Sequence, residues 1–190
     1  MRFDAVPLPG RRRAWGQAEF LAADGRGKAY INLADKNQVA VVDTKAMKIV
    51  NKWPTTPGGS LVGVSMDPER RRLFIGCRKP QKLVVMGADD GKVLADLAIG
   101  AGADATKFDG DAFASCGDGT LAVARETVPG KFHVVQTVQT PRGARTMGID
   151  PKTHTLYLPT AEFEPPSEGQ SRPRPKPGSF VIVVVNPSGK

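Results

Sequence analysis

The chain has 190 residues, of which 40% are hydrophobic, and it contains 21 glycines and 16 prolines. This length is enough for one well-buried domain, and the glycine and proline content suits an all-β protein with many turns. No apolar run approaches the roughly 18 residues of a membrane-spanning helix, which excludes a helical span, and the net charge of +8 permits anionic partners without identifying one.

Residues 1–16 precede the regular part of the sequence. Phe3–Leu8 aligns with the fourth strand of the repeats described below, and Arg11–Arg13 adds a basic stretch after it. The segment lacks the apolar core of a secretory signal peptide. We therefore interpret residues 1–16 as the outer strand of a truncated preceding unit, followed by a basic loop.

Four related units follow, at residues 17–57, 58–101, 102–142 and 143–190. Each opens with an apolar strand that ends at a turn aspartate, and a second apolar strand carries an aromatic residue at a similar place. The turn aspartates are Asp24, Asp67, Asp109 and Asp150, and the aromatic residues are Tyr30, Phe74, Phe113 and Tyr157. A third strand follows in every unit, and a fourth in the first three. Four short strands in about 40–45 residues is the period of a β-propeller blade, so the sequence predicts an all-β propeller with about four blades of four antiparallel strands.

Two of the units depart from the common pattern. The third has a first turn that is shorter by three residues, so that Phe113 follows Asp109 by four positions. The last is interrupted by a proline-rich insertion at 164–177, which contains five prolines and a basic tail. Because proline cannot donate to a β-ladder, we expect the insertion to be an extended, mobile surface loop that does not pair in a sheet. A proline-rich ligand for an aromatic groove is the alternative.

Three stretches also show a resemblance to a known family. Val39–Val50, Gly143–Asp150 and Asp150–Leu158 resemble the YVTN-type (YncE-like) β-propeller repeats of bacteria, and the likeness extends from Gln17 to the C-terminus. The resemblance implies about seven blades and an export signal, so that this chain is the C-terminal half of a longer propeller with a periplasmic or extracytoplasmic location. The alternative is a four-bladed ring in which Phe3–Leu8 completes the last blade beside Val181–Val185. An open arc would leave blade edges through which copies self-associate.

The innermost strands of a propeller begin at one end of a central channel, so equivalent positions form a ring there. Five residues before each turn aspartate stand Glu19, Val62, Asp104 and Arg145, and Arg142 lies in the neighbouring loop. Carboxylates and guanidinium groups in one ring predict a ligand site at the channel mouth. Mutual pairing of these groups is the competing interpretation.

The sequence offers little for catalysis. It has no haem-attachment motif, no zinc-ligand spacing and no phosphate-binding loop, and its two histidines, His133 and His154, fall in an outer strand and at a turn. No cofactor is indicated. Cys77 and Cys116 occupy equivalent places in adjacent units, too far apart for a disulfide, which predicts two free thiols.

We therefore expect a non-catalytic binding module whose partner is a protein or a small anionic ligand. The main alternative is a lactonase-type propeller hydrolase in which Glu19 and Asp104 hold a divalent metal. A nucleic-acid-binding propeller is a further alternative, but the basic residues lie scattered over turns without interleaved aromatic side chains.

Overall fold

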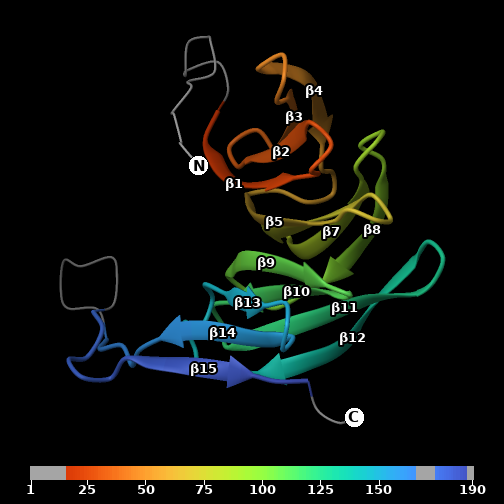
Figure 1. Cartoon of the computed structure of the whole chain (residues 1–190). Coiled ribbons are helices and arrows are strands. Elements are labelled where there is room, and N and C mark those ends of the chain that lie inside the picture. Colours follow the sequence, from red (N-terminus) through yellow and green to blue (C-terminus); the bar gives the residue numbers. More distant parts are fainter. Residues whose placement is uncertain (1–15, 166–173, 188–190) are drawn as a thin grey trace, which may run out of the picture.

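The structure is a computed structural model, and it describes residues 16–165 and 174–187. These residues form fifteen β-strands in four antiparallel sheets and contain no helix (Figure 1). The predicted all-β architecture is confirmed. The first sheet contains β1 (Ala18–Ala23), β2 (Lys28–Leu33), β3 (Gln38–Asp43) and β4 (Lys48–Pro54), and the second contains β5 (Leu61–Asp67), β6 (Arg72–Arg78), β7 (Gln81–Gly87) and β8 (Val93–Ala98). The third contains β9 (Ala103–Asp109), β10 (Asp111–Cys116), β11 (Thr120–Val128) and β12 (Lys131–Gln139), and the fourth contains β13 (Gly148–Asp150), β14 (Thr155–Thr160) and β15 (Val181–Val185).

Each sheet is a meander in which consecutive strands are hydrogen-bonded neighbours. The sheets follow one another along an arc, with the first and fourth at its two ends (Figure 1). The first strands of neighbouring sheets lie together, since β1 contacts β5 and β5 contacts β9. In the described part of the chain the fourth sheet has three strands. The segment Phe3–Leu8, predicted as an outer strand, lies outside the described residues.

The turn aspartates act as the sequence predicts. Oδ1 of Asp24, Asp67 and Asp150 accepts a hydrogen bond from the backbone amide two residues on, at 2.8, 2.9 and 2.9 Å. Such an Asx bond holds the turn closed between the first two strands. The third sheet differs, because only Gly110, with φ 76°, separates Asp109 from the start of β10 at Asp111.

Apolar side chains fill the space between successive sheets. The first and second sheets meet around Tyr30 and Leu73, the second and third around Phe74, and the third and fourth around Leu121 and Leu158. Burial of these residues supplies the main stabilising free energy of the arc. The second and third sheets approach closely at Gly63, where a Cβ atom would lie 2.4 Å from the amide nitrogen of Thr106.

The first strand of the last sheet is shorter than predicted. The sequence predicts an apolar strand that runs through 144–149 up to the turn at Asp150, but β13 covers only Gly148–Asp150. Its partner β14 contains Pro159, which stands opposite the position of Thr146 in the register set by Gly148 and Tyr157. Proline has no amide hydrogen to donate, so a longer β13 would gain no amide bond from this position.

The prediction that the insertion 164–177 pairs with nothing is wrong at its two ends. Phe163 forms an antiparallel bridge with Pro175, the Glu164 amide donates to the Arg174 carbonyl at 2.8 Å, and the Lys176 amide donates to the Glu162 carbonyl at 2.8 Å. The ladder uses only Arg174 and Lys176, the residues on either side of Pro175, so the missing proline amide costs no bond. Residues 166–173 lie outside the described part.

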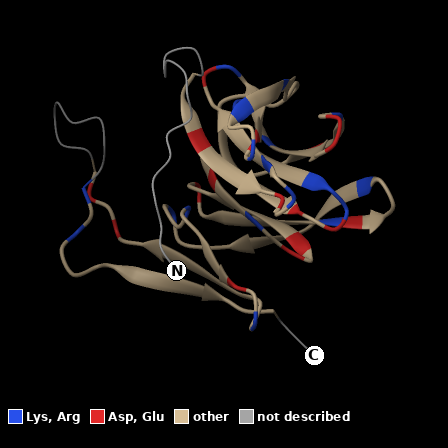
Figure 2. Cartoon of the chain, turned by 45° about the horizontal axis from the view of Figure 1, so that its top comes forward, with Lys and Arg blue, Asp and Glu red and all other residues tan. Residues whose placement is uncertain are grey.

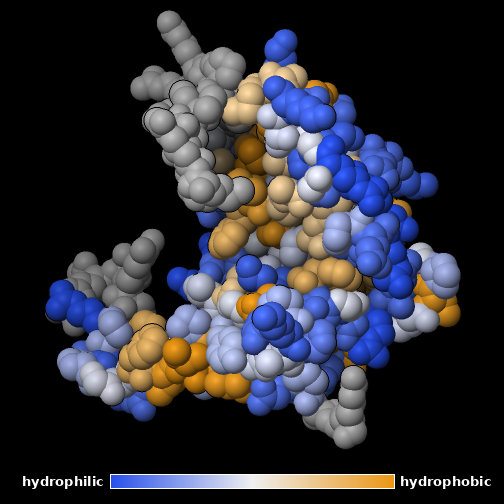
Figure 3. Space-filling model, viewed as in Figure 1, coloured by the Kyte–Doolittle hydropathy of each residue, from blue (hydrophilic) through white to orange (hydrophobic). Residues whose placement is uncertain are grey.

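The outer face of the last sheet is apolar and exposed. It appears as an orange patch at the lower left of Figure 3, over β14 and β15. The large hydrophobic side chains exposed there are Tyr157, Phe180, Ile182 and Val184. Tyr157 is 40% exposed, whereas its repeat equivalents Tyr30 and Phe74 are buried against a neighbouring sheet. Among the described residues, this face has no sheet packed on it.

Charged residues of both signs are spread over strands and turns rather than gathered in one basic face (Figure 2). None of the described residues forms a helix that is long and apolar enough to cross a bilayer.

Candidate functional site

The residues predicted at the channel mouth come from three different sheets. Asp104 stands in β9, where Arg78 Nη2 from β6 donates to its Oδ1 at 2.7 Å and Thr146 Oγ1 lies 3.4 Å from its Oδ2. Arg78 is itself held by a bond from Nε to the Ala103 carbonyl at 2.8 Å. The carboxylate of Asp104 is therefore neutralised by an arginine of the preceding sheet, and not by Arg145.

Arg142 and Arg145 lie in the turn that precedes β13. Both residues are exposed, and neither guanidinium has an ion-pair partner among the described residues. The backbone of the turn is well held, because the Arg142 carbonyl accepts from Thr160 Oγ1 at 3.2 Å and the Arg145 carbonyl accepts from Ser115 Oγ. Two fixed backbone positions thus present two guanidinium groups that are available to an anion.

Glu19 is not brought together with these residues. It is exposed on β1, in the sheet at the far end of the arc from the turn that carries Arg145 (Figure 1), and its Oε1 accepts from Gln17 Nε2 at 3.1 Å. Nor do the described residues contain a group of three or more His, Cys, Asp or Glu side chains placed to hold a metal ion. The pairing of Asp104 with Arg78 leaves that carboxylate ill suited to a cation.

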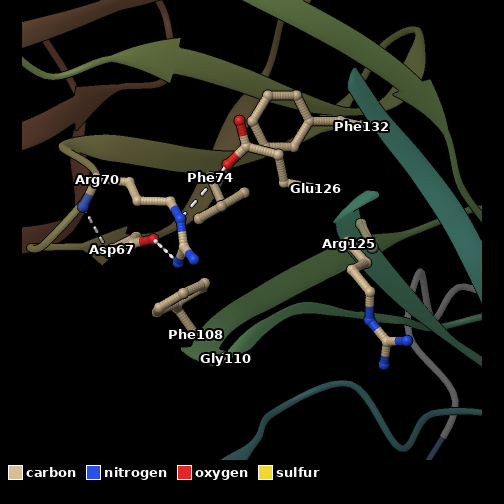
Figure 4. A pocket seen from close by; sticks show the side chains of 9 residues that line it. Asp67, Arg70, Phe74, Phe108, Gly110, Arg125, Glu126 and Phe132 are labelled. Carbon is tan, nitrogen blue, oxygen red and sulfur yellow. Dashed lines mark hydrogen bonds and ion pairs between the residues drawn. The ribbon is translucent and has the colours of Figure 1, made fainter. Parts of the chain in front are cut away.

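A second candidate site lies between the second and third sheets, away from the predicted ring. It is a small pocket of about 60 Å³ whose lining includes three phenylalanine rings (Figure 4). Phe74 and Phe108 stack with ring centroids 5.3 Å apart and planes 6° from parallel, and Phe132 meets Phe74 edge-on at 6.3 Å. The rings come from β6, β9 and β12, so that the pocket exists only where the two sheets meet.

Charged side chains surround the opening of this pocket (Figure 4). Arg70 Nη1 lies 3.4 Å from Asp67 Oδ2, and Arg70 Nε lies 3.8 Å from Glu126 Oε2. Arg125 also lines the pocket, but it forms a two-pronged ion pair with Asp111 at 2.7 and 2.6 Å. Both carboxylates of the opening therefore depend on one arginine, held at distances longer than those of strong charged hydrogen bonds, about 2.7–2.9 Å.

A wider groove of about 320 Å³ adjoins the pocket and shares Arg70 and Glu126 with it. Its remaining lining comes from Arg72 and from the tip of the β11–β12 hairpin, which contributes Thr127, Val128 and Pro129. The hairpin projects from the body of the third sheet (Figure 1). Pocket and groove therefore lie next to each other beside the first turn of the second sheet.

At two of the three junctions between sheets, a side chain of the following sheet contacts the turn aspartate of the preceding sheet at an equivalent place. At the first junction, Arg71 Nη1 donates to Asp24 Oδ2 at 3.0 Å, and the same guanidinium reaches the Tyr30 hydroxyl at 3.0 Å and Asp89 Oδ1 at 2.9 Å. At the third junction, His154 Nδ1 lies 2.6 Å from Asp109 Oδ2.

The environment of Asp24 favours its charged form. Burial raises the pKa of this carboxyl group, but hydrogen bonds from the Lys28 and Arg26 amides and the Arg71 guanidinium outweigh burial, so that the pKa lies below its ordinary value of 3.8. The pKa of Arg71 is raised above its ordinary value. The hydrogen bond to Asp89 raises it most, burial lowers it, and the hydrogen bond to Asp24 raises it further. The contact is therefore an ion pair at neutral pH.

The cysteines are free, as the sequence predicts, and both are buried. Burial raises the pKa of the Cys77 thiol to about 12 and that of the Cys116 thiol to about 11. A thiol of such high pKa forms little thiolate near neutral pH and is a poor nucleophile.

Comparison with solved structures settles the fold. The chain is similar to hydrazine synthase of Kuenenia stuttgartiensis, with a TM-score of 0.69 and 13% identity over 86% of this chain and 44% of that one. It is also similar to the WD40 domain of Toxoplasma gondii coronin, with a TM-score of 0.63 and 15% identity over 80% of this chain and 41% of that one. The chain has a β-propeller fold. At these identities the likeness establishes the fold alone, and the propeller spans less than half the length of either protein.

No family model matches the propeller sequence, and no curated protein matches it. Because the fold is a β-propeller, the four sheets are called blades 1 to 4 below.

Sequence reasoning missed both Arg78 and the pocket between blades 2 and 3. Alignment of the repeats compares only equivalent positions. Arg78 and Asp104 are not equivalent, because Arg78 is the last residue of the second strand of blade 2 and meets Asp104 across the junction with blade 3. The shortened turn after Asp109 was a visible sign that one junction differs from the others.

Proposed function

We propose that the chain is a non-catalytic propeller module that binds an anionic group, carried by a protein or a small ligand, at the channel mouth of blades 3 and 4. The observation that supports this proposal most is the exposed pair Arg142 and Arg145 on a turn whose backbone is fixed by Thr160 and Ser115. Asp104 does not cancel their charge, because Arg78 already neutralises it. A planar guanidinium binds carboxylate or phosphate through two parallel hydrogen bonds, which favours such ligands.

We further propose that the repeats are of the bacterial YVTN type and belong to a propeller of about seven blades in an extracytoplasmic compartment. The turn and strand residues of Val39–Val50 and Asp150–Leu158 support this assignment. We also propose that copies of the chain self-associate through the apolar outer face of blade 4, since exposed strand edges and apolar faces recruit partners.

The test of the channel mouth uses citrate and inorganic phosphate as probes, titrated into the full chain and followed by calorimetry. Arg145→Ala should weaken binding of the probe that binds by about tenfold or more, since loss of a charged hydrogen bond costs at least about 1.5 kcal/mol. Arg145→Lys should recover only part of the loss, because an ammonium group lacks the planar fork.

Arg26→Ala is the matched control. Arg26 is an exposed arginine in blade 1, in the turn that follows Asp24, and its removal should leave the affinity for the probe unchanged. If Arg145→Ala lowers stability while the probe binds as before, Arg145 is a structural residue and the proposed site is wrong.

A further inference from the structure

The three junctions between blades differ in which side chain contacts the turn aspartate of the preceding blade. At the first, the residue four positions after a turn aspartate, Arg71, binds the turn carboxylate of the preceding blade, Asp24. At the third, His154, four positions after Asp150, does the same with Asp109. In both cases the following blade supplies the group that meets a carboxylate oxygen at the edge of the junction.

The second junction has no such group. The carboxylate in question is Asp67, and the residue that should meet it would come from the first turn of blade 3. That turn is shorter by three residues, with Gly110 alone between Asp109 and the start of β10, so the equivalent of Arg71 does not exist. Oδ2 of Asp67 meets only Arg70 of its own turn, at 3.4 Å.

The pocket described above occupies this place. We propose that it is a binding site for a guanidinium group carried on an exposed arginine of a partner protein, which supplies from outside the cation that blade 3 lacks. Three phenylalanine rings line it, and a guanidinium group is attracted to the faces of aromatic rings. Its volume of about 60 Å³ corresponds to a few water molecules at about 10–15 Å³ each, which suits a planar head of four heavy atoms.

The two carboxylates at the opening are held in place independently of any cation. Oδ1 of Asp67 accepts the Glu69 and Arg70 amides at 2.9 and 3.0 Å, and Oε1 of Glu126 accepts the Gly130 amide at 2.6 Å. In each group the second oxygen meets, among the described residues, only Arg70, at 3.4 Å from Asp67 and 3.8 Å from Glu126. Preorganised acceptors of this kind favour binding, because little ordering is needed when the ligand arrives.

Arg70 is a weak internal occupant of the opening. Its side chain is 62% exposed, and its two ion-pair distances are 3.4 and 3.8 Å, against 3.0 Å for the contact of Arg71 with Asp24. An exposed arginine held in this way is readily displaced. The adjoining groove of about 320 Å³, lined by Val128 and Pro129, offers room for the backbone on either side of the incoming arginine.

The experiment uses the full chain with ¹³C-labelled phenylalanine, observed by NMR. The probe is the peptide acetyl-Gly-Gly-Arg-Gly-Gly-amide, and its comparison is the same peptide with citrulline, a neutral isostere of arginine. The arginine peptide should shift phenylalanine ring signals saturably, and the citrulline peptide should bind at least about tenfold more weakly, because it has the shape without the charge.

Variants locate the site. Arg70→Ala should raise the affinity by about fivefold or more, because it removes a competing internal cation. Asp67→Asn should lower it about tenfold or more while the amide oxygen still accepts the turn hydrogen bonds. Asp150→Asn is the matched control, since Asp150 makes the same Asx turn in blade 4 away from the pocket. Glu126→Gln gives a second test should Asp67→Asn fail to fold.

Three results would overturn the proposal: equal binding of the citrulline peptide, equal effects of Asp67→Asn and Asp150→Asn, or ring shifts produced by a glutamate peptide instead. Arg145→Ala should leave binding of the arginine peptide unchanged, so that this site and the channel mouth succeed or fail separately.

Discussion

The contact between blades 1 and 2 offers the sharpest test of how the propeller is held together. Arg71 is 15% exposed and Asp24 is 2% exposed in their side chains, and the guanidinium also touches the Tyr30 hydroxyl and Asp89. Replacing Arg71 by alanine leaves the buried Asp24 carboxylate with only the Arg26 and Lys28 amides, at 2.8 and 2.9 Å. We expect a clear loss of stability.

The size of the loss follows from the separate contacts. Loss of the charged hydrogen bond to buried Asp24 costs about 1.5–3 kcal/mol. The pair with Asp89 adds about 0–1 kcal/mol, since that side chain is 67% exposed. The Tyr30 hydroxyl keeps its bond to the Ala88 carbonyl at 2.8 Å, so it adds little. From these contributions together, Arg71→Ala should lower the free energy of unfolding by about 3 kcal/mol.

The backbone conformation of Arg71 provides a second test of this estimated loss of stability. Arg71 has φ 57°, a left-handed conformation that costs a residue with a Cβ atom about 1 kcal/mol and costs glycine nothing. Arg71→Gly should therefore be about 1 kcal/mol less destabilising than Arg71→Ala, although both lose the same side-chain contacts. Arg70→Ala is the control, because the long ion pairs of this exposed neighbouring arginine are worth only about 0–1 kcal/mol.

Urea unfolding followed by circular dichroism measures these differences, first near neutral pH and then in acid. The folded-state pKa of Asp24 lies below its ordinary value of 3.8, so its contribution is present above pH 3.8 and is lost as the pH falls through the folded-state pKa. The gap between the native protein and Arg71→Ala should shrink there. A gap below about 1 kcal/mol at neutral pH, or one that does not change in acid, would refute this account of the contact.

Three further predictions concern packing, the thiols and assembly. Gly63→Ala should cost about 1–3 kcal/mol in thermal unfolding, because its Cβ would lie 2.4 Å from the Thr106 amide nitrogen, whereas Gly148→Ala, with nothing within 4 Å, should be neutral or slightly stabilising. Cys77 and Cys116 should react with Ellman's reagent at pH 8 only after unfolding, and rapid labelling of the folded chain would contradict their burial. Light scattering should detect dimers or larger soluble species that Ile182→Lys on the face of blade 4 diminishes; a monodisperse monomer would count against self-association.

The repeat pattern in the sequence was sufficient to predict the propeller. The turn aspartates recur because an Asx bond closes the same turn in three blades, and Tyr30 and Phe74 recur because each side chain packs against a neighbouring blade. These are local and periodic constraints, which a single sequence records directly. Tyr157 stands at the equivalent position in blade 4, although it lies on the exposed outer face of that blade. Periodicity alone therefore did not reveal where the described arc ends.

Contacts between repeats were beyond the reach of the same reasoning. Asp104 pairs with Arg78, which is aligned with no member of the predicted ring and lies 26 positions earlier in the chain. The two errors of local structure both lie near a proline. The ladder of β13 stops two pairs short of Pro159, whereas Pro175 is tolerated because its ladder uses the residues on either side of it. The rule that proline breaks a strand is too coarse, because the outcome depends on whether the missing amide faces a partner.

The shortened turn after Asp109 has the widest consequence of any feature in the sequence. Within the repeat it is a small deletion that leaves the strands of blade 3 intact. Across the junction it removes the residue that would meet Asp67, and the carboxylate, the phenylalanine rings and a weakly held Arg70 remain as an open pocket. In a protein built from repeats, a position where one unit lacks a contact that its equivalents make is a place where an outside ligand can supply it. Comparison of junctions, in addition to comparison of repeats, therefore identifies candidate sites that the repeated turn and strand patterns do not reveal.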